Sequence, residues 1–255
     1  MKMKFKKPIA SQKIKKSMFY STQDFGIIGK CQGYKSKICI IGCGAGGHDD
    51  TIDPSDMEVL LDGCNDPNDN IGLSVMHAGV IGGINKKTIC GIAPKAEIYY
   101  AKCIDDNKIT GLKEISAALL WAIVNKANVV ILDAFPDDKS NYFDSILEKA
   151  KQQNITVLVR LRDINEQWED DENILIVEPI EGKFAVLPSD KPNKCRIAIP
   201  NKDFYTTFLM GKYAKIEKED LSISLLAGLF SVGYQKFGEK GKAATTSQIL
   251  KKLQS

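Results

Sequence analysis

The segment that most constrains the fold is residues 72–135, where apolar residues change from strand-like to helix-like spacing and back again. Residues 98–104 form an apolar, β-rich run between turn signals, and residues 129–132 form a second continuous apolar run. Between these runs, apolar residues recur at helical spacing from Ile115 to Ile123. A strand, a helix and a strand in this order predict a βαβ unit and hence a parallel sheet.

The same alternation continues on both sides of this unit. Apolar runs predict further buried strands, and amphipathic or wholly apolar stretches of greater length predict helices. We expect the strands at residues 38–41, 155–161, 174–177, 184–187 and 195–199, and the helices at residues 74–84, 142–153 and 221–234. The pattern predicts an α/β fold with a central, mostly parallel twisted sheet flanked by helices.

Length and composition are those of an ordinary globular protein. The chain has 255 residues, of which 44% are hydrophobic and 26% charged, and its net charge is only +3. No low-complexity linker interrupts residues 18–255, so we expect one domain there. Residues 1–17 form a basic arm with seven lysines between Lys2 and Lys16. We expect a solvated arm, and an arm that binds nucleic acid or an acidic protein is the alternative.

The cysteines and the amino-terminal sequence bear on the cellular compartment that we expect for the protein. Seven cysteines are an odd number without CxxC pairs, and several fall in apolar runs where a free thiol packs as a small hydrophobic group. Neither a secretory leader nor a long apolar run is visible. We therefore expect a cytoplasmic protein with free cysteines and no membrane partner.

A family resemblance rests on this central segment. Residues 91–135, which read GIAPKAEIYYAKCIDDNKITGLKEISAALLWAIVNKANVVILDAF, resemble the central segment of subtilisin-like serine proteases. That segment has a GVAP turn, a strand, an acidic turn, a helix with a Trp and an NMSLG-type strand. The register extends outward to KICIIGCG at the first strand and to YAKIEKEDLSISLLAGL near the end. The resemblance implies the three-layer subtilisin-like fold.

The resemblance also locates the positions of the family's catalytic residues. The catalytic aspartate falls on Gly42 in KICIIGCG, and the histidine falls on Leu73 in GLSVMHAG. The serine falls on Asp220 in KEDLSISLLAG, and the oxyanion asparagine falls on Asp163 in RLRD. None of these replacements supplies the group that the family's chemistry needs. The resemblance therefore predicts a catalytically inactive member of the family that is not an enzyme.

Other polar residues near these positions are predicted to be structural. We expect His77 to be a hydrogen-bonded core histidine and His48 to lie on the surface. Ser222 and Ser224 follow the serine position on one helix, but no histidine base lies in register with them.

The carboxylates Asp163 and Asp220 offer an alternative enzyme, because the family geometry brings them together. Two neighbouring carboxylates can share a proton and serve as the acid and base of a hydrolase that works at acidic pH, or they can hold a divalent cation. We favour the interpretation that both are solvated in a vacated cleft, and we expect no metal or cofactor.

A glycine cluster offers a third hypothesis. Gly42, Gly44 and Gly47 match the GxGxxG dinucleotide fingerprint directly after a predicted strand. The acidic segment that follows, residues 49–69, favours a surface loop over the helix that the fingerprint needs. Calcium is conceivable there, but the EF-hand pattern is absent.

The leading functional hypothesis is binding of another protein or peptide, or a structural role in a homo- or hetero-oligomer. Subtilisin-like proteases bind peptides by β-addition to two strand edges. The resemblance places these edges at Thr110, Gly111 and Leu112 and at Leu132, Asp133, Ala134 and Phe135. Phe135 replaces a glycine that keeps the family's specificity pocket open.

Overall fold

The computed structural model describes residues 10–11, 32–84, 88–237 and 244–255. Most of the predicted basic arm, residues 1–17, lies outside the described residues.

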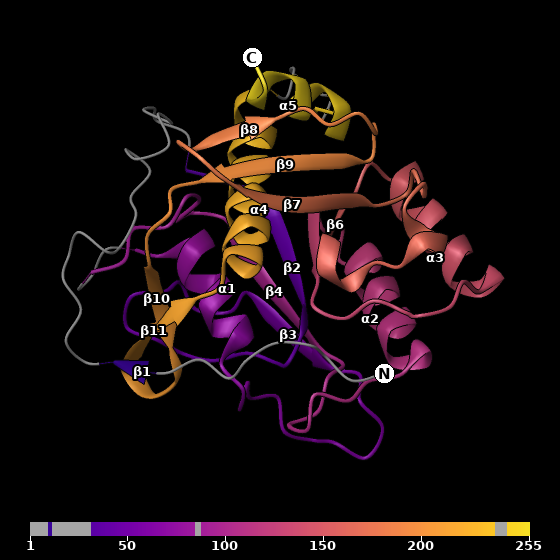
Figure 1. The fold of residues 1–255 in the computed structure, drawn as a ribbon. Coiled ribbons are helices and arrows are strands. Elements are labelled where there is room, and N and C mark those ends of the chain that lie inside the picture. Colours follow the sequence, from indigo (N-terminus) through magenta and orange to yellow (C-terminus); the bar gives the residue numbers. More distant parts are fainter. Residues whose placement is uncertain (1–9, 12–31, 85–87, 238–243) are drawn as a thin grey trace.

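A mixed sheet of eight strands forms the centre of the molecule (Figure 1). Its order is β3-β4-β2-β5-β6-β7-β9-β8, and every neighbouring pair is parallel except β8 with β9. The strands are β2 (Lys37–Gly42), β3 (Asp56–Val59), β4 (Glu97–Lys102), β5 (Val129–Leu132), β6 (Thr156–Arg160), β7 (Leu175–Glu181), β8 (Ala185–Leu187) and β9 (Lys194–Ile199). The prediction of a mostly parallel α/β sheet is confirmed.

Helices cover both faces of this sheet and give the fold three layers. Helices α1 (Leu73–Gly82) and α4 (Lys218–Phe237) pack on one face, and α2 (Leu112–Val124) and α3 (Asn141–Gln152) pack on the other (Figure 1). Alternate residues of β2 enter the two cores: Ile38 and Ile40 join the α1/α4 side, whereas Cys39 and Ile41 join the α2/α3 side. A final helix, α5 (Thr246–Leu253), packs against α4.

The predicted helices form where their apolar patterns place them. Ser140 caps α3 by accepting a hydrogen bond from the backbone of Phe143, and α3 buries one apolar stripe. Helix α4 is apolar almost all round, and residues 220–234 are all buried. No helix among the described residues is long and apolar enough to cross a membrane.

A second sheet of three strands was not predicted. It has the order β1-β11-β10 and consists of β1 (Ala10–Ser11), β10 (Phe204–Phe208) and β11 (Lys212–Ile216). Strand β10 lies against α1, where the hydroxyls of Thr206 and Thr207 donate to the carbonyls of Met76 and Val75.

The acidic segment at residues 49–69 corrects the prediction of a plain surface loop. It contains the edge strand β3, and two of its carboxylates, Asp50 and Asp69, are buried. Asp69 accepts hydrogen bonds from the backbone of Ile71, Gly72 and Val75, so its carboxylate caps the first turn of α1. Burial raises the pKa of Asp69 despite these three hydrogen bonds.

Candidate functional site

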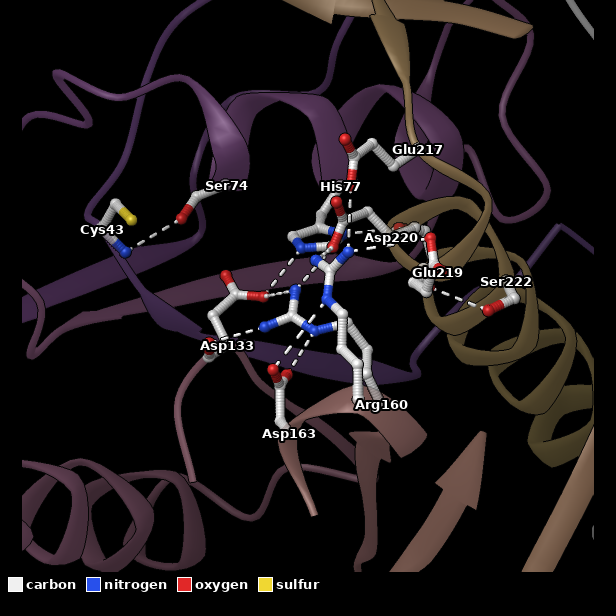
Figure 2. A network of polar contacts seen from close by, with 12 residues as sticks. Cys43, Ser74, His77, Asp133, Arg160, Asp163, Glu217, Glu219, Asp220 and Ser222 are labelled. Carbon is white, nitrogen blue, oxygen red and sulfur yellow. Dashed lines mark hydrogen bonds and ion pairs between the residues drawn. The ribbon is translucent and has the colours of Figure 1, made fainter. Parts of the chain in front are cut away.

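Five elements converge at the carboxyl edge of the sheet. Strands β2 and β6 end there at Gly42 and Arg160, and Asp133 directly follows β5. The amino-terminal ends of α1 and α4 face the same region (Figure 2). In open α/β sheets this edge is where ligands bind. The four positions implied by the family resemblance fall on these elements or on the short 3-10 helix η3 (Leu161–Asp163), which follows β6.

The carboxylate of Asp133 occupies the space beside Gly42. A side chain on Gly42 would overlap the carboxylate of Asp133, because that carboxylate fills the space beside the last residue of β2. The backbone nitrogen of Asp133 donates to Ile41 on the neighbouring strand, which holds the two positions together. The absence of a side chain at Gly42 is therefore required by the carboxylate of Asp133.

Arg160 connects three carboxylates at the centre of the site (Figure 2). Its Nε donates to Asp163 at 2.6 Å, and its Nη1 donates to Asp220 at 2.6 Å and to Asp133 at 3.1 Å. Its Nη2 donates to the backbone carbonyl of Asp133 at 2.6 Å. The Arg160 side chain is only 1% exposed. Burial opposes its charge, but the three carboxylates outweigh burial and raise the pKa of Arg160 further.

Arg162 forms the outer part of the same cluster. Its Nη2 donates to Asp220 at 2.7 Å, and its Nη1 donates to Glu217 at 3.1 Å. Asp220 lies in the first turn of α4, where the helix dipole also favours a carboxylate. Burial alone would raise the pKa of Asp220, but Arg160, Arg162 and His77 outweigh it and hold this pKa below its ordinary value.

This geometry contradicts both earlier interpretations of Asp163 and Asp220. The two carboxylates are not solvated in a vacated cleft, because Arg160 bridges them and Asp220 is only 3% exposed. They are also poorly suited to share a proton, because guanidinium groups keep Asp220 ionised. The acid-hydrolase hypothesis is therefore wrong for this pair.

His77 contacts two residues that sequence reasoning did not connect with it. Its Nε2 lies 2.8 Å from Oδ1 of Asp133, and its Nδ1 lies 2.5 Å from Oγ of Ser224. All three side chains are buried. The prediction of a hydrogen-bonded core histidine is confirmed, and this histidine contacts Ser224 although no histidine was found in register with that serine. Ser222 does not join this set, because its hydroxyl donates to the backbone of Glu219.

The hydroxyl of Ser224 lies between two acceptors. It is 2.6 Å from the backbone carbonyl of Asp220 and 2.5 Å from the imidazole of His77. When the hydroxyl donates to Nδ1 of the imidazole, Nε2 carries the ring proton and donates to Oδ1 of Asp133. When the hydroxyl donates to the carbonyl, the ring carries both protons and donates to Ser224 as well as Asp133. The donor and acceptor roles in the two imidazole contacts therefore depend on the tautomer of the ring.

Sequence reasoning missed this set although one signal was present. His77 follows Leu73 by four residues, and Ser224 follows Asp220 by four residues. A separation of four residues places side chains on the same face of a helix, one turn apart. Each residue therefore lies one turn further along the same helix face than the family's catalytic position.

The two predicted peptide-binding segments differ in exposure. Leu112 is 39% exposed, and neighbouring Ile109 is 49% exposed. By contrast, Leu132, Asp133, Ala134 and Phe135 are all buried.

Phe135 lies in an aromatic cluster and does not face solvent. The centre of its ring lies 4.7 Å from that of Trp168 and 5.7 Å from that of Phe143. These rings fill the space beside residues 132–135.

The dinucleotide hypothesis is not supported by the described structure. Residues 43–55 after β2 are loop, and the next helix, α1, does not begin until Leu73. Without a helix after the glycines, the pyrophosphate has no helix amino terminus to bind. Gly44 instead adopts a positive φ of 118° and packs against the backbone of Pro67 and Asn68.

His48 is not the predicted surface residue, since it is only 9% exposed. Its Nε2 donates to the carbonyl of Lys212 at 3.0 Å, and its Nδ1 accepts from the backbone of Asp50. Within the described part of the chain, no group of three histidine, cysteine, aspartate or glutamate residues could hold a metal ion.

The three-layer arrangement of a mostly parallel sheet between helices is consistent with a subtilisin-like fold. Comparison with curated proteins supports this class through distant relatives. The chain is 28% identical over 127 residues to the minor extracellular protease Epr of Bacillus subtilis, a match that covers 49% of this chain and 20% of that protein. It is 19% identical over 192 residues to a thermostable alkaline protease of Halalkalibacterium halodurans, which covers 72% of this chain and 52% of that protein.

The matched segments thus span a fifth and about half of these two relatives. No family model matches the chain. Both relatives are named proteases and point to an enzyme family, so they overturn the prediction that the chain is not an enzyme. That prediction considered only four positions and did not foresee Ser224, His77 and Asp133 in contact.

Proposed function

We propose that this chain binds polypeptides at the carboxyl edge of its sheet and cleaves them. The observation that carries the proposal is the convergence of His77, Asp133, Arg160 and Asp220 at the edge where strands end and α1 and α4 begin. The relatives named as proteases support a polypeptide as the substrate class.

The segment before α2 is the better of the two candidate edges for an extended peptide. Ile109 and Leu112 expose apolar side chains there, and Gly111 has extended backbone with φ −122° and ψ 168°. An extended segment can hydrogen-bond to a second chain while neighbouring apolar side chains contact it. The side chains of residues 132–135 are buried, so this segment offers no exposed side chains to a bound peptide.

The test uses purified protein and a diverse peptide mixture at pH values from 4 to 8, with mass spectrometry of cleaved and retained peptides. We expect selective cleavage, and we expect Leu112→Glu to weaken it by placing a charge at the binding edge. Val124→Glu is the matched control, because Val124 is 75% exposed at the opposite end of the same helix. If the protein neither cleaves nor retains any peptide, the proposal is contradicted. Equal effects of the two substitutions would contradict the assigned edge.

A further inference from the structure

Ser224, His77 and Asp133 form a continuous hydrogen-bonded set of hydroxyl, imidazole and carboxylate. The hydroxyl lies 2.5 Å from one ring nitrogen, and the carboxylate lies 2.8 Å from the other. These are the contacts that a serine nucleophile, a general base and an orienting carboxylate require, and they are recognised by geometry and not by sequence position.

We propose that Ser224 is the nucleophile of this protein, with His77 as its general base and Asp133 as the residue that positions His77. This inference rests on the proposed function and deepens it by naming the reacting group. Ser224 and His77 each lie four residues after the position that the family resemblance assigns. At a rise of 1.5 Å per residue, the set lies about 6 Å further along both helices.

The carboxylate of the set comes from a different strand than the one that the family resemblance implies. The carboxylate comes from Asp133, which follows β5, and not from position 42 at the end of the neighbouring strand β2. Because Asp133 fills the space beside Gly42, its Oδ1 reaches His77. Its second oxygen, Oδ2, is buried and has no hydrogen-bond partner among the described residues. Asp133 therefore directs one oxygen to the imidazole and one toward β2.

The proposed reaction is hydrolysis of a peptide bond, and it needs only these three side chains and water. Oγ of Ser224 forms a bond to the carbonyl carbon of the substrate, and its proton passes to Nδ1 of His77. The proton on Nε2 stays on the ring and is held by Asp133, which stabilises the imidazolium. The carbon–nitrogen bond then breaks, and the proton on Nδ1 passes to the leaving amine. Water hydrolyses the resulting ester in the reverse sense and restores the hydroxyl.

The structure holds this set in a closed state. Ser224 and His77 have no exposed surface, and Asp220 lies one turn nearer the start of the same helix. Arg160 and Arg162 both donate to Asp220, and Arg160 also donates to Asp133. The proposal therefore requires Asp220 and its arginine partners to move before a substrate reaches Ser224.

The experiment labels the protein with a fluorophosphonate, which forms a bond to an activated serine oxygen as fluoride leaves, and maps the label by mass spectrometry. Wild type and Asp220→Ala are compared, the latter to remove the carboxylate that closes the site. We expect label on Ser224, faster in Asp220→Ala. Ser224→Ala should abolish label at position 224, because it removes the oxygen that bonds to phosphorus, and Asp133→Asn should reduce labelling by about 10⁴-fold, the scale typical of the orienting carboxylate. Ser222→Ala is the matched control, because Ser222 is buried on the same helix and does not contact His77.

The outcomes separate this inference from the proposed function. Absence of label on Ser224 in both wild type and Asp220→Ala, with both proteins folded by circular dichroism, overturns the inference. Peptide cleavage that persists in Ser224→Ala also overturns it, and it leaves the proposed function standing. Label on Ser224 without any peptide cleavage or retention supports the nucleophile and overturns the polypeptide substrate. If Ser224→Ala fails to fold, Asp133→Asn provides the same comparison, because it preserves shape and alters the orienting group.

Discussion

Replacement of Arg160 is the most informative perturbation of this fold. Arg160→Met keeps a side chain of similar length but removes hydrogen bonds to Asp133, Asp163 and Asp220. Asp220 would keep Arg162 and Asp133 would keep His77, but both carboxylates would remain buried with fewer partners. The substitution should therefore expose the cost of buried negative charge.

The magnitude follows from what remains after the change. Removing one partner of a buried ion pair typically costs about 3–5 kcal/mol, because the other charge is left uncompensated. The remaining partners of Asp133 and Asp220 limit the loss, so we expect about 4 kcal/mol of unfolding free energy. For a domain of this size that is a fall of about 8–16 °C in the melting temperature.

Urea unfolding followed by circular dichroism measures the effect directly. Arg196→Met is the control, because Arg196 is exposed and donates only to the carbonyl of Pro188. The control should change the unfolding free energy by no more than about 0.5 kcal/mol. Adding Asp220→Asn to Arg160→Met should recover part of the loss, because it removes a buried charge that has lost one of its two arginine partners. A loss below about 1 kcal/mol for Arg160→Met, with unchanged m, would refute the argument that the cluster depends on this cation.

Three further predictions concern Gly42, Asp220 and the described cysteines. Gly42→Ala should lower the unfolding free energy by about 1–3 kcal/mol, because its methyl group would overlap the carboxylate of Asp133, and Asp133→Ala should relieve the loss in urea unfolding. The folded-state pKa of Asp220 lies below its unfolded value of about 3.9, so its contribution is present above that pH and is lost as pH falls through the folded pKa. The stability difference between wild type and Asp220→Asn should therefore shrink between pH 6 and pH 2, and a constant difference would contradict the ion pairs. Iodoacetamide and peptide mapping should show fast modification only at the half-buried members of the described cysteines, because burial shields the others and raises the pKa of Cys103 and Cys195 to about 12. The half-buried cysteines are Cys64 and Cys90, and the protected ones are Cys39, Cys43, Cys103 and Cys195.

The elements of the large sheet could be predicted because each is local in its pattern. Strands β2, β5 and β6 are continuous apolar runs, as expected when both faces are covered by helices. Helix α4 could be predicted because it is apolar almost all round. Strands β10 and β11 could not, since their half-polar sequences FYTTF and KYAKI are stabilised by pairing with each other and, for β10, by contact with α1.

The candidate site was less predictable, because its contacts join residues far apart in the chain. Arg160 lies in an apolar run and gives no local sign that it meets Asp133 and Asp220. His77 and Ser224 are 147 positions apart, so no spacing rule brings them together without the packing of α1 on α4. The family register pointed to the carboxyl edge of the sheet and to Leu73 and Asp220, which lie one helical turn before His77 and Ser224.

Stability alone does not account for the cluster. Replacing buried ion pairs by well-packed apolar residues of similar volume is often neutral or stabilising, so a fold that needed only a filled core could dispense with these charges. The cluster instead keeps ionisable groups buried together, with Oδ2 of Asp133 unpaired and a serine hydroxyl placed against an imidazole. Buried polar groups without partners cost stability, and such costs are characteristic of sites where the geometry serves chemistry. The pairing of Ser224 with His77 therefore agrees with the chemical role proposed for it above.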